Sequence, residues 1–505
     1  MNLLLSIPVA LPLACALLTL FGRRNIPFQR AVTIAGSVLN LLLALLLFRV
    51  IRSDGILALQ IGNWPAPYGI TFVADLFSAV MLIMSGLMAT SVAIYSIVMI
   101  DEARERFHYH VFFNVLIMGV NGAFLTGDLF NLYVWFETML MASFVLLSLG
   151  GERPQLQGAI KYVAMNFLSS ALFLAGVGII YGITGTLNMA DLAVVVRQSD
   201  HPGIISIASV LFLIAFGIKS AAFPLFFWLP ASYHTPPSPV SAIFAGLLTK
   251  VGVYALIRVF TLIFMPETEI TQLVILVMAG FTMVTGVLGA AAQMEMRRLL
   301  SFHIVSQIGY MIMGLGMYTA ASLGGAVLYI VHNIIAKTNL FFVAGVVAHK
   351  TGTNDLKKLG GIYKRSPILA VLFLISAMAL AGLPPLSGFF AKLSLVIPGL
   401  SNGHYVVTAT AIAVGLLTLF SMTKIWNEVF WKPAPGDQST SDAALSWTKQ
   451  EKICLLGPVV LLAACSVVIG LAGGSVYELV TDIGAQLKSA DAYIQAVLPN
   501  GGRVP

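Results

Sequence analysis

Charged side chains and cysteines are scarce in this sequence. Asp, Glu, Lys and Arg make up 10% of the 505 residues, whereas 58% are hydrophobic, which is far from the composition of a soluble globular domain. The three cysteines, Cys15, Cys454 and Cys465, are isolated in apolar segments without the paired spacing of a zinc, haem or iron–sulfur site. We therefore expect them to be ordinary packing residues.

Motifs for bond-making chemistry are also missing. The sequence has no phosphate-cradling Gly-Lys-Ser/Thr loop, no dinucleotide-binding glycine fingerprint, no nucleophile elbow and no His or Cys ligand set. The formal net charge of +7 comes from basic residues scattered over loops, so nucleic acid is not an expected partner. The sequence therefore predicts neither an enzyme nor a cofactor, and energy must come from an ion gradient or a partner.

Long apolar runs take the place of these motifs. They recur from Leu3 almost to Leu471, with no polar segment long enough for a separate soluble domain. Because roughly 20 apolar residues cross a bilayer, we predict an all-α polytopic membrane protein with about 14 transmembrane helices. Their approximate spans are 2–21, 30–50, 72–98, 108–126, 129–149, 158–182, 206–229, 239–262, 271–292, 299–317, 321–348, 367–398, 405–430 and 453–473.

The distribution of Lys and Arg over the loops supports this number of helices. If the N-terminus is outside, most basic loop residues fall inside, as the positive-inside rule requires. The outside loops then carry only Arg49, Arg52, Arg197, Arg258, Lys488 and Arg503. An even number of helices with both termini outside is therefore the consistent topology.

Five basic residues remain within the predicted helices: Lys219, Lys250, Lys337, Lys392 and Lys424. A lysine at bilayer depth costs roughly 3 kcal/mol on insertion scales, so it persists mainly where it has a partner, water or a function. Five prolines between Pro224 and Pro239 follow Lys219, and proline breaks a helix. A broken helix beside buried ammonium groups indicates an ion pathway.

A second break interrupts the segment 367–398, where Gly382, Pro384, Pro385 and Gly388 precede Lys392. Paired interruptions are typical of inverted repeats with a site at the membrane midplane. We expect broken helices 7 and 12 in two inverted five-helix repeats. The predicted regions are 1–107 (helices 1–3), 108–262 (first repeat, helices 4–8), 263–431 (second repeat, helices 9–13) and 432–505 (polar loop, helix 14 and tail).

Glu137 is the acidic residue that lies well inside a predicted helix, and Lys219 is its natural partner. A carboxylate stabilises a buried ammonium, so moving the two groups together or apart changes proton affinity strongly. The pair could load a proton, which a lateral relay would carry to Lys392 for exchange with the opposite surface. The predicted relay consists of Lys250, His332 and Lys337.

Other polar residues allow more than one interpretation. His234 and His303 could be functional or interfacial. Asp75, Asp128 and Glu428 lie near predicted helix ends, where caps or interfacial roles are favoured. Hard cations prefer oxygen ligands, so Asp75, Asp128 or Glu137 could ligate Na+, although no ligand cluster is evident. We expect solvated inner loops at 349–366 and 432–452, and a flexible or partner-bound tail from Lys488.

Four segments resemble a known family. They cover roughly residues 70–430 and read FPLFFWLPASYHTPPSPVSAIFAGLLTKVGVYALIR, LFNLYVWFETMLMAS, RRLLSFHIVSQIGYMIMG and GLPPLSGFFAKL. These segments are similar to the antiporter-like, proton-pumping subunits of respiratory complex I and Mrp-type Na+/H+ antiporters. The resemblance implies fourteen helices, a loading pair Glu137–Lys219 and a terminal site at Lys392. Lys250 would connect the halves, and His332 and Lys337 would lie on the central hydrophilic axis.

Within that family, NLYVWFETMLMASFVLLSLGG and HNIIAKTNLFFVAG are most similar to the D-type members of the Mrp antiporters. This implies a proton-translocating subunit in the cell membrane of a prokaryote, with lipid and other antiporter subunits as partners and H+ and Na+ as transported ions. The alternatives are a proton-pumping subunit of NADH:quinone oxidoreductase or of a membrane-bound hydrogenase, and a structural scaffold. Copurifying subunits would discriminate between the first two.

Overall fold

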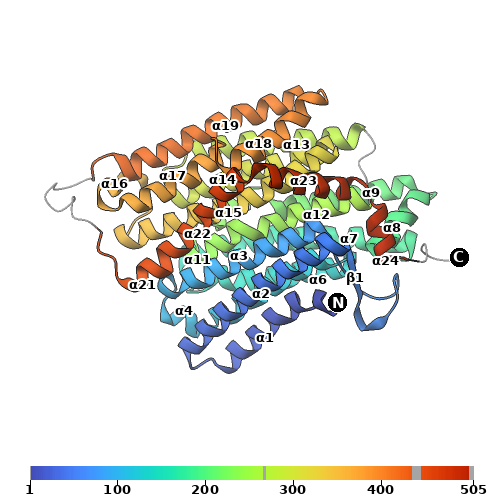
Figure 1. Ribbon diagram of the computed structural model, residues 1–505, viewed down its shortest axis with the longest axis horizontal. Coiled ribbons are helices and arrows are strands. Elements are labelled where there is room, and N and C mark those ends of the chain that lie inside the picture. The colour runs from blue at the N-terminus through green and yellow to red at the C-terminus, as the bar shows by residue number, and fades with distance from the viewer. Residues whose placement is uncertain (1, 265–268, 435–444, 500–505) are drawn as a thin grey trace.

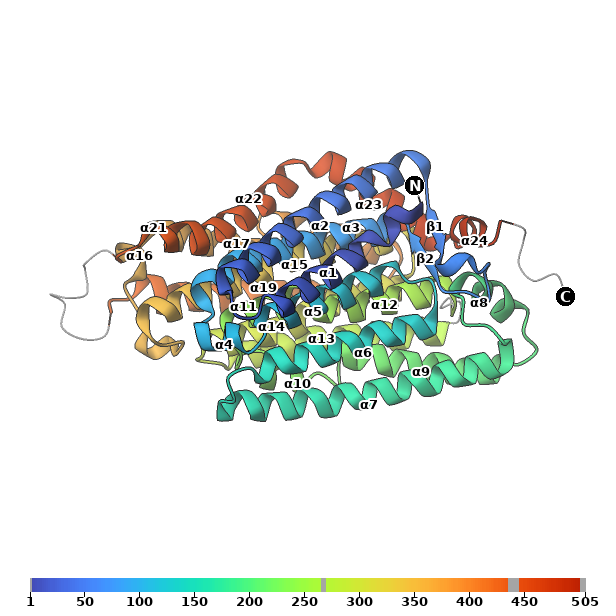
Figure 2. The same ribbon diagram turned by 90° about the horizontal axis from the view of Figure 1, so that it is seen from below.

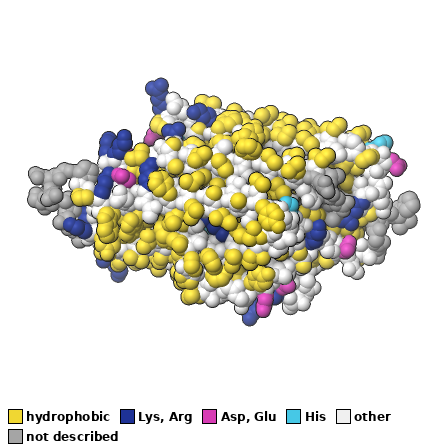
Figure 3. All heavy atoms as spheres, turned by 90° about the horizontal axis from the view of Figure 1, so that it is seen from above, with side chains coloured by type: hydrophobic (Ala, Val, Ile, Leu, Met, Phe, Trp, Pro, Cys, Tyr) yellow, Lys and Arg dark blue, Asp and Glu magenta, His cyan; other side chains and the backbone are white. Residues whose placement is uncertain are grey.

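The computed structural model describes residues 2–264, 269–434 and 445–499, which form an elongated bundle with most helices along its long axis (Figures 1 and 2). Within these residues, 11 helices are long and apolar enough to cross a membrane, and four shorter apolar helices accompany them. Hydrophobic side chains cover much of the face in Figure 3, and charged side chains gather mostly toward its two ends. The protein is therefore a multi-pass membrane protein.

The N-terminal region contains three of the predicted spans and an additional hairpin. Its elements are η1 (Asn2–Leu5), α1 (Ile7–Phe21), α2 (Ile26–Asp54), β1 (Leu57–Gln60), η2 (Ile61–Asn63), β2 (Thr71–Ala74), α3 (Leu76–Met99) and α4 (Glu102–Arg106). The hairpin is antiparallel, with Leu57 opposite Ala74. The prediction that the third span begins at residue 72 was wrong. Helix α3 begins only after Asp75, which caps it through a capping box with Ser78.

The middle of the chain forms the next group of helices. Its elements are α5 (Tyr109–Leu125), α6 (Leu129–Ser148), α7 (Arg153–Thr184), α8 (Met189–Val195), η3 (Val196–Gln198), α9 (Pro202–Ser220), α10 (Trp228–Ser232), α11 (Ser238–Ile243), a π-helical turn η4 (Phe244–Leu248) and α12 (Thr249–Leu262). Figure 2 places α7 and α9 along one long edge of the bundle. The predicted spans therefore have helical counterparts, and the seventh is interrupted between α9 and α10.

The second half follows the same plan. Its elements are α13 (Glu269–Ala291), α14 (Met296–Met317), α15 (Ala320–Thr351), η5 (Leu356–Lys358), α16 (Ile362–Arg365), α17 (Pro367–Ala381), α18 (Ser387–Ser401), α19 (Tyr405–Ile425) and a π-helical segment η6 (Trp426–Trp431). The twelfth predicted span is thus divided into α17 and α18. The last elements are α21 (Lys449–Glu451), η7 (Lys452–Leu456), α22 (Gly457–Leu471), α23 (Gly473–Lys488) and α24 (Asp491–Val497).

Helix α15 forms the centre of the bundle, because all its residues from Ser322 to Val347 are buried apart from Val331. It packs against α3, α14, α17, α18, α22 and α23. Its crossing with α23 depends on two glycines, since a Cβ on Gly324 would lie 2.1 Å from the Val480 carbonyl oxygen and one on Gly484 2.0 Å from that of Ala320. The element with the most buried surroundings therefore carries His332 and Lys337.

One expectation about a polar segment was wrong. Within the described residues, the tail from Lys488 is not simply flexible, because it forms helix α24, whose Tyr493 ring lies 5.3 Å from the guanidinium of Arg258. The inner loops also contact each other, since Lys350 forms an ion pair with Glu451 at 2.6 Å and Leu445 donates to the Arg365 carbonyl at 3.0 Å. Residues 435–444 and 500–505 of these segments lie outside the described residues.

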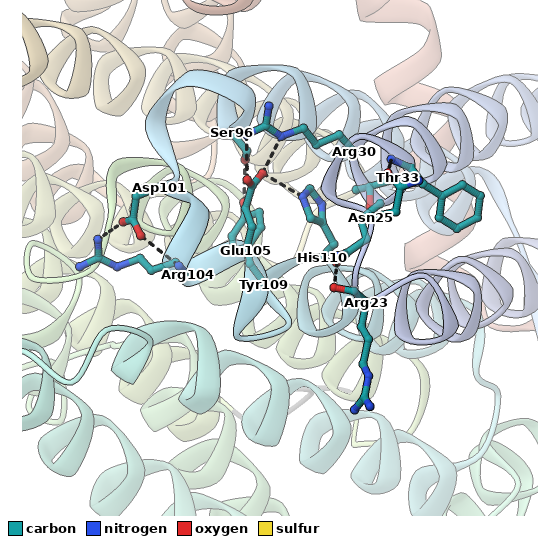
Figure 4. Close-up of polar contacts among 12 residues, drawn as sticks. Arg23, Asn25, Arg30, Thr33, Ser96, Asp101, Arg104, Glu105, Tyr109 and His110 are labelled. Atoms are coloured by element: carbon teal, nitrogen blue, oxygen red, sulfur yellow. Dashed lines mark hydrogen bonds and ion pairs between the residues drawn. The ribbon is translucent and has the colours of Figure 1, made fainter.

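The first described element, η1, and the last, α24, both contact strand β1 and so lie toward the same end of the bundle (Figure 1). At the other end, a buried ion-pair cluster ties α2, α4 and α5 together (Figure 4). Arg30 donates from Nε and Nη2 to the carboxylate of Glu105 at 2.7 Å each, and His110 Nε2 lies 3.2 Å from the same group. The N-terminal helices are thus fixed to the bundle through Glu105.

Candidate functional site

Lys219 lies where helix α9 ends. Ala221 has a left-handed φ of 61°, and helical structure resumes only at α10. Lys219 occupies the last turn of α9 and is 7% exposed. The partial negative charge at a helix C-terminus favours an ammonium group. The proline-rich stretch therefore produces the predicted break and leaves Lys219 buried beside it.

A serine joins Glu137 to Lys219. Lys219 Nζ donates to Ser170 Oγ at 3.1 Å, and the Ser170 hydroxyl donates to the carboxylate of Glu137. Nζ also lies 5.4 Å from the centroid of the Phe136 ring, within cation–π range. Among the described residues, Glu137 and Lys219 form no direct ion pair. The predicted pair is thus a three-residue group contributed by α6, α7 and α9.

Lys250 follows the π-helical turn η4, which the sequence analysis did not predict. Its Nζ donates to the Ala245 carbonyl at 2.5 Å, and its side chain is completely buried. Such turns are rare and are frequent at functional sites. Two residues on, Gly252 lets α12 contact α9, since a Cβ there would lie 3.1 Å from Cβ of Lys219. Lys250 is thereby placed on the helix that faces Lys219.

Lys337 is completely buried on α15, and its Nζ lies 3.4 Å from the Leu300 carbonyl oxygen of α14. The neighbouring Thr338 abuts the turn η4, because a Cβ on Gly246 would lie 2.4 Å from Thr338 Oγ1. Lys337 and Lys250 are close enough to interact electrostatically. The structure therefore brings the two lysines together at the contact of η4 with α15.

His332 connects α15 with the second break. Its Nδ1 lies 2.8 Å from Ser387 Oγ, which lies 2.8 Å from Ser466 Oγ of α22. Gly388 permits this arrangement, because a Cβ there would lie 1.8 Å from the Ala379 carbonyl oxygen and 2.8 Å from Cε1 of His332. A glycine is therefore required where α18 passes α17 and α15.

Lys392 folds back over the break between α17 and α18. Its Nζ donates at 2.6 Å to the carbonyl of Ala381, the last residue of α17, and lies 5.4 Å from the centroid of the Tyr310 ring. Lys219 precedes its break and Lys392 follows its own in sequence. In space, however, the Lys392 ammonium returns to the C-terminal end of the preceding half-helix, which is where Lys219 lies in α9.

His234 and Lys424 have local partners. His234 Nδ1 lies 2.9 Å from the Pro230 carbonyl, and burial, with Arg297 nearby, lowers the pKa of His234 to about 4. Lys424 donates to the carbonyls of Ala291, the last residue of α13, and Gln293 at 3.0 and 2.8 Å. These contacts give Lys424 a role in capping α13.

The three acidic residues near helix ends also have structural partners. Asp75 caps α3 and pairs with Arg258, whose Nη1 and Nη2 lie 2.7 and 2.8 Å from its oxygens. Burial alone raises the pKa of Asp75, but Arg258 holds it below its ordinary value. Asp128 caps α6, and burial raises its pKa to about 6. Glu428 pairs with Lys432 at 2.5 Å. The favoured cap or interfacial interpretation agrees with these contacts.

The described ranges contain no group of three or more His, Cys, Asp or Glu residues placed to hold a metal ion. The carboxylate of Asp75 pairs with Arg258, and that of Glu137 accepts a hydrogen bond from Ser170. The three cysteines are free thiols, and Cys15 packs against Gly36. Within the described residues, neither carboxylate therefore belongs to a cluster of cation ligands.

Sequence reasoning missed several residues of this site. Arg258 was placed in an outside loop, but it is buried on α12 and paired with Asp75. The serines of the site, Ser170, Ser387 and Ser466, were not singled out, because a serine in an apolar helix most often donates to its own backbone, as Ser220 does to Phe216. These serines can be recognised only by their proximity to a charged or titratable side chain on a neighbouring helix.

These features define a class of membrane protein, and comparison with known families agrees. Residues 126–418 match the family model described as NADH:quinone oxidoreductase/Mrp antiporter, TM. The chain belongs to this family, and within it to the D-type members of the Mrp antiporters.

Curated relatives support this assignment over the full length. The chain is 45% identical over 499 residues to the D subunit of the Na(+)/H(+) antiporter of Alkalihalophilus pseudofirmus, covering 99% of this chain and 100% of the relative. It is 39% identical over 498 residues to the corresponding protein of Bacillus subtilis, with the same coverage.

Solved structures share the fold. A chain of the Mrp complex from Dietzia sp. superimposes with a TM-score of 0.89 at 33% identity, covering 99% of this chain and 100% of that one. A chain of respiratory complex I from Thermus thermophilus gives a TM-score of 0.82 at 24% identity over 96% of this chain and 100% of that one, which establishes similarity of fold alone.

Proposed function

We propose that the protein translocates protons as one subunit of a multisubunit Na+/H+ antiporter, with inward proton flow driving Na+ export by the assembled complex. The observation that carries the proposal is a set of basic groups inside the bundle: Lys219, Lys250, Lys337 and His332 are buried, and Lys392 is half-buried at the second break. Such groups are unfavourable in a membrane interior and mark ion pathways. The chain is a transporter subunit rather than an enzyme.

Proton loading is proposed at Glu137, Ser170 and Lys219. The serine hydroxyl accepts from the ammonium and donates to the carboxylate, so a proton can move between the two charges by exchange through one hydroxyl. A hydrogen bond to a neutral oxygen holds an ammonium less strongly than a direct ion pair does. Lys219 can therefore release its proton toward Lys250 without separating a tight ion pair.

The onward relay follows the electrostatic neighbours. Lys250 and Lys337 interact with each other, and His332 interacts with both Lys337 and Lys392. A proton that binds to one basic group repels the proton on the neighbouring group. This repulsion favours transfer of the second proton further along the relay. Lys392, half-buried at the second break, is the proposed group of exchange with the opposite surface.

The duplicated breaks support two inverted repeats, residues 108–262 and 263–431. In each, a helix is interrupted and an ammonium group lies at or folds back to the C-terminal end of the first half. The contacts of the first described element, η1, and the last, α24, with the same strand β1 fit an even number of crossings. We place that end outside the cell membrane of a prokaryote, on the distribution of loop Lys and Arg.

Partner subunits are proposed from the surface beside Glu137. This side chain is only half-buried, and its neighbours one turn away on α6, Val134 and Met141, are exposed. A carboxylate facing hydrocarbon is unfavourable, so we expect a neighbouring antiporter subunit to cover this face of α6. The subunit that supplies the Na+ ligands would belong to the same assembly.

The test is Lys219→Ala in the assembled complex, with Lys424→Ala as the matched control. Removing the Lys219 ammonium should lower Na+-driven proton movement in everted vesicles by about 100-fold, while copurification of the other subunits stays intact. Lys424→Ala removes another helix lysine from a capping position, so the activity of this variant should stay near wild type. Near-normal activity of Lys219→Ala would refute the proposal, and copurifying iron–sulfur or flavin subunits would instead favour a redox-driven complex.

A further inference from the structure

Lys337 and Lys392 contact the same helix at positions far apart. Lys337 Nζ approaches the Leu300 carbonyl, and Lys392 Nζ lies over the Tyr310 ring. The ten residues between these positions on α14 correspond to about 15 Å at 1.5 Å per residue. A hydrogen bond spans only about 3 Å, so a proton that travels from one lysine to the other needs intermediate groups.

One face of α14 supplies two such groups. His303 lies three residues after Leu300, and Gln307 lies four residues after His303. These helical spacings place both on the side of α14 that carries Tyr310. The facing helix α15 runs antiparallel, since Tyr329 OH donates to Gln307 Oε1 at 2.5 Å while Lys337 reaches Leu300. His332 and Asn333, between Tyr329 and Lys337 on α15, are therefore level with His303.

These middle residues share an unusual property. His303, Gln307, His332 and Asn333 are all completely buried. Within the described residues, six of their polar atoms have no hydrogen-bond partner: Nδ1 and Nε2 of His303, Nε2 of Gln307, Nε2 of His332, and Nδ2 and Oδ1 of Asn333. Buried polar atoms are nearly always bonded to protein or to ordered water. Ordered water is the usual partner of buried polar atoms that no protein group satisfies.

The electrostatic surroundings of His303 agree with this position. The charged groups that act on it are Lys337, from α15, and Lys392, from α18. The titratable neighbour level with it on α15 is His332, which interacts with the same two lysines. Its own helix supplies Tyr310, which is completely buried. The charges of Lys337 and Lys392 therefore both act on His303, and His332 is level with it on α15.

We propose that His303 is a further proton-relay residue, which passes the proton between Lys337 and His332 through water held between α14 and α15. The proton from Lys337 binds the free ring nitrogen of His303, and the proton on the other nitrogen leaves toward His332. A rotation of the ring restores the starting tautomer, so the residue is unchanged after each transfer. This proposal rests on the proposed proton-translocating function.

The experiment compares His303→Gln and His303→Leu in the assembled complex. Glutamine keeps a polar side chain but cannot carry a proton, and leucine removes polarity as well. Both should lower antiport by at least about tenfold with the other subunits still copurifying, and the pH profile of the residual rate should lose one ionisation. His404→Gln, at the start of α19 and away from the relay, is the control and should match wild type.

Other outcomes are equally decisive. A wild-type rate and pH profile for His303→Gln would overturn the inference, while inactive Lys219→Ala would leave the proposed function standing. If Lys219→Ala also retained full activity, the proposed function itself would fail. Loss of assembly in both His303 variants would show that the ring is a packing element, and would overturn the relay role.

Discussion

At the scale of single residues, the buried lysines donate to neutral oxygens. Lys219 donates to the Ser170 hydroxyl, and Lys250 and Lys392 donate to carbonyls of irregular backbone. A neutral oxygen stabilises an ammonium less than a carboxylate does, so proton release costs less free energy. Groups that bind protons without an adjacent buried anion are suited to passing them on.

Ser170 is the residue whose removal tests this view most directly. Ser170→Ala should lower antiport by about tenfold or more, because it removes the hydroxyl that joins Lys219 to Glu137. Ser170→Thr keeps a hydroxyl and should retain most activity. Na+-driven proton movement in vesicles measures both.

The neighbouring Ser169 provides the control. Its hydroxyl is equally buried and donates to the Ala215 carbonyl at 2.7 Å, so Ser169→Ala removes a helix contact of about 1 kcal/mol without touching the pair. Full activity of Ser170→Ala would mean that Glu137 and Lys219 exchange protons by another route.

The charged members of the site could be predicted from sequence, and the serines could not. A lysine such as Lys250 is so unfavourable in an apolar segment that its presence alone indicates a role. Ser170 and Ser387 are compatible with any transmembrane helix, since a hydroxyl can bond to its own backbone. Their roles depend on the packing of α6, α7 and α9, and of α15, α18 and α22, which no local pattern encodes.

At the scale of elements, irregular backbone is concentrated where the lysines lie. The two breaks follow from proline and could be predicted, because proline removes a backbone donor. The π-helical turn Phe244–Leu248 could not, since a widened turn requires no proline and leaves the apolar pattern intact. The hairpin β1–β2 was missed because its short strands, such as Thr71–Ala74, adjoin an apolar run that reads as one helix.

The break between α17 and α18 tolerates little change. Gly388→Ala should distort it, because the added Cβ would lie 1.8 Å from the Ala379 carbonyl oxygen, and overpacking typically costs about 1–3 kcal/mol. We expect a lower melting temperature of the complex and reduced antiport through a displaced His332–Ser387 contact. Gly178→Ala in α7, where nothing lies within 4 Å of the added atom, should be neutral or slightly stabilising. Equal melting temperatures for the two variants would contradict this account.

At the scale of the whole molecule, ion pairs at the two ends of the bundle join segments that are far apart in the sequence. Asp75–Arg258 lies near the hairpin and α24, and Arg30–Glu105 joins α2 and α4 at the other end (Figure 4). Neither pair could be predicted from sequence, because the partners are 183 and 75 residues apart. The resemblance, by contrast, identified the family correctly, since its motifs cover most of the bundle.

Glu105 tests this end of the bundle. Glu105→Gln leaves Arg30 without its buried partner, which typically costs about 3–5 kcal/mol, so the melting temperature of the purified complex should fall. The matched control is Glu102→Gln in the same short helix, where the pair with Arg106 is exposed. An exposed pair contributes about 0–1 kcal/mol, so this variant should melt near wild type.

The same cluster predicts a pH dependence. Burial alone raises the pKa of Glu105, but hydrogen bonds from His110 and Arg30 hold it below its ordinary value of 4.5. Because the folded-state pKa is depressed, the stabilisation is fully present above the unfolded-state pKa and is lost as pH falls through the folded-state value. The difference in melting temperature between wild type and Glu105→Gln should therefore be constant near neutral pH and shrink below about pH 4.5. A difference that persisted unchanged at pH 3 would show that Glu105 acts through packing rather than charge.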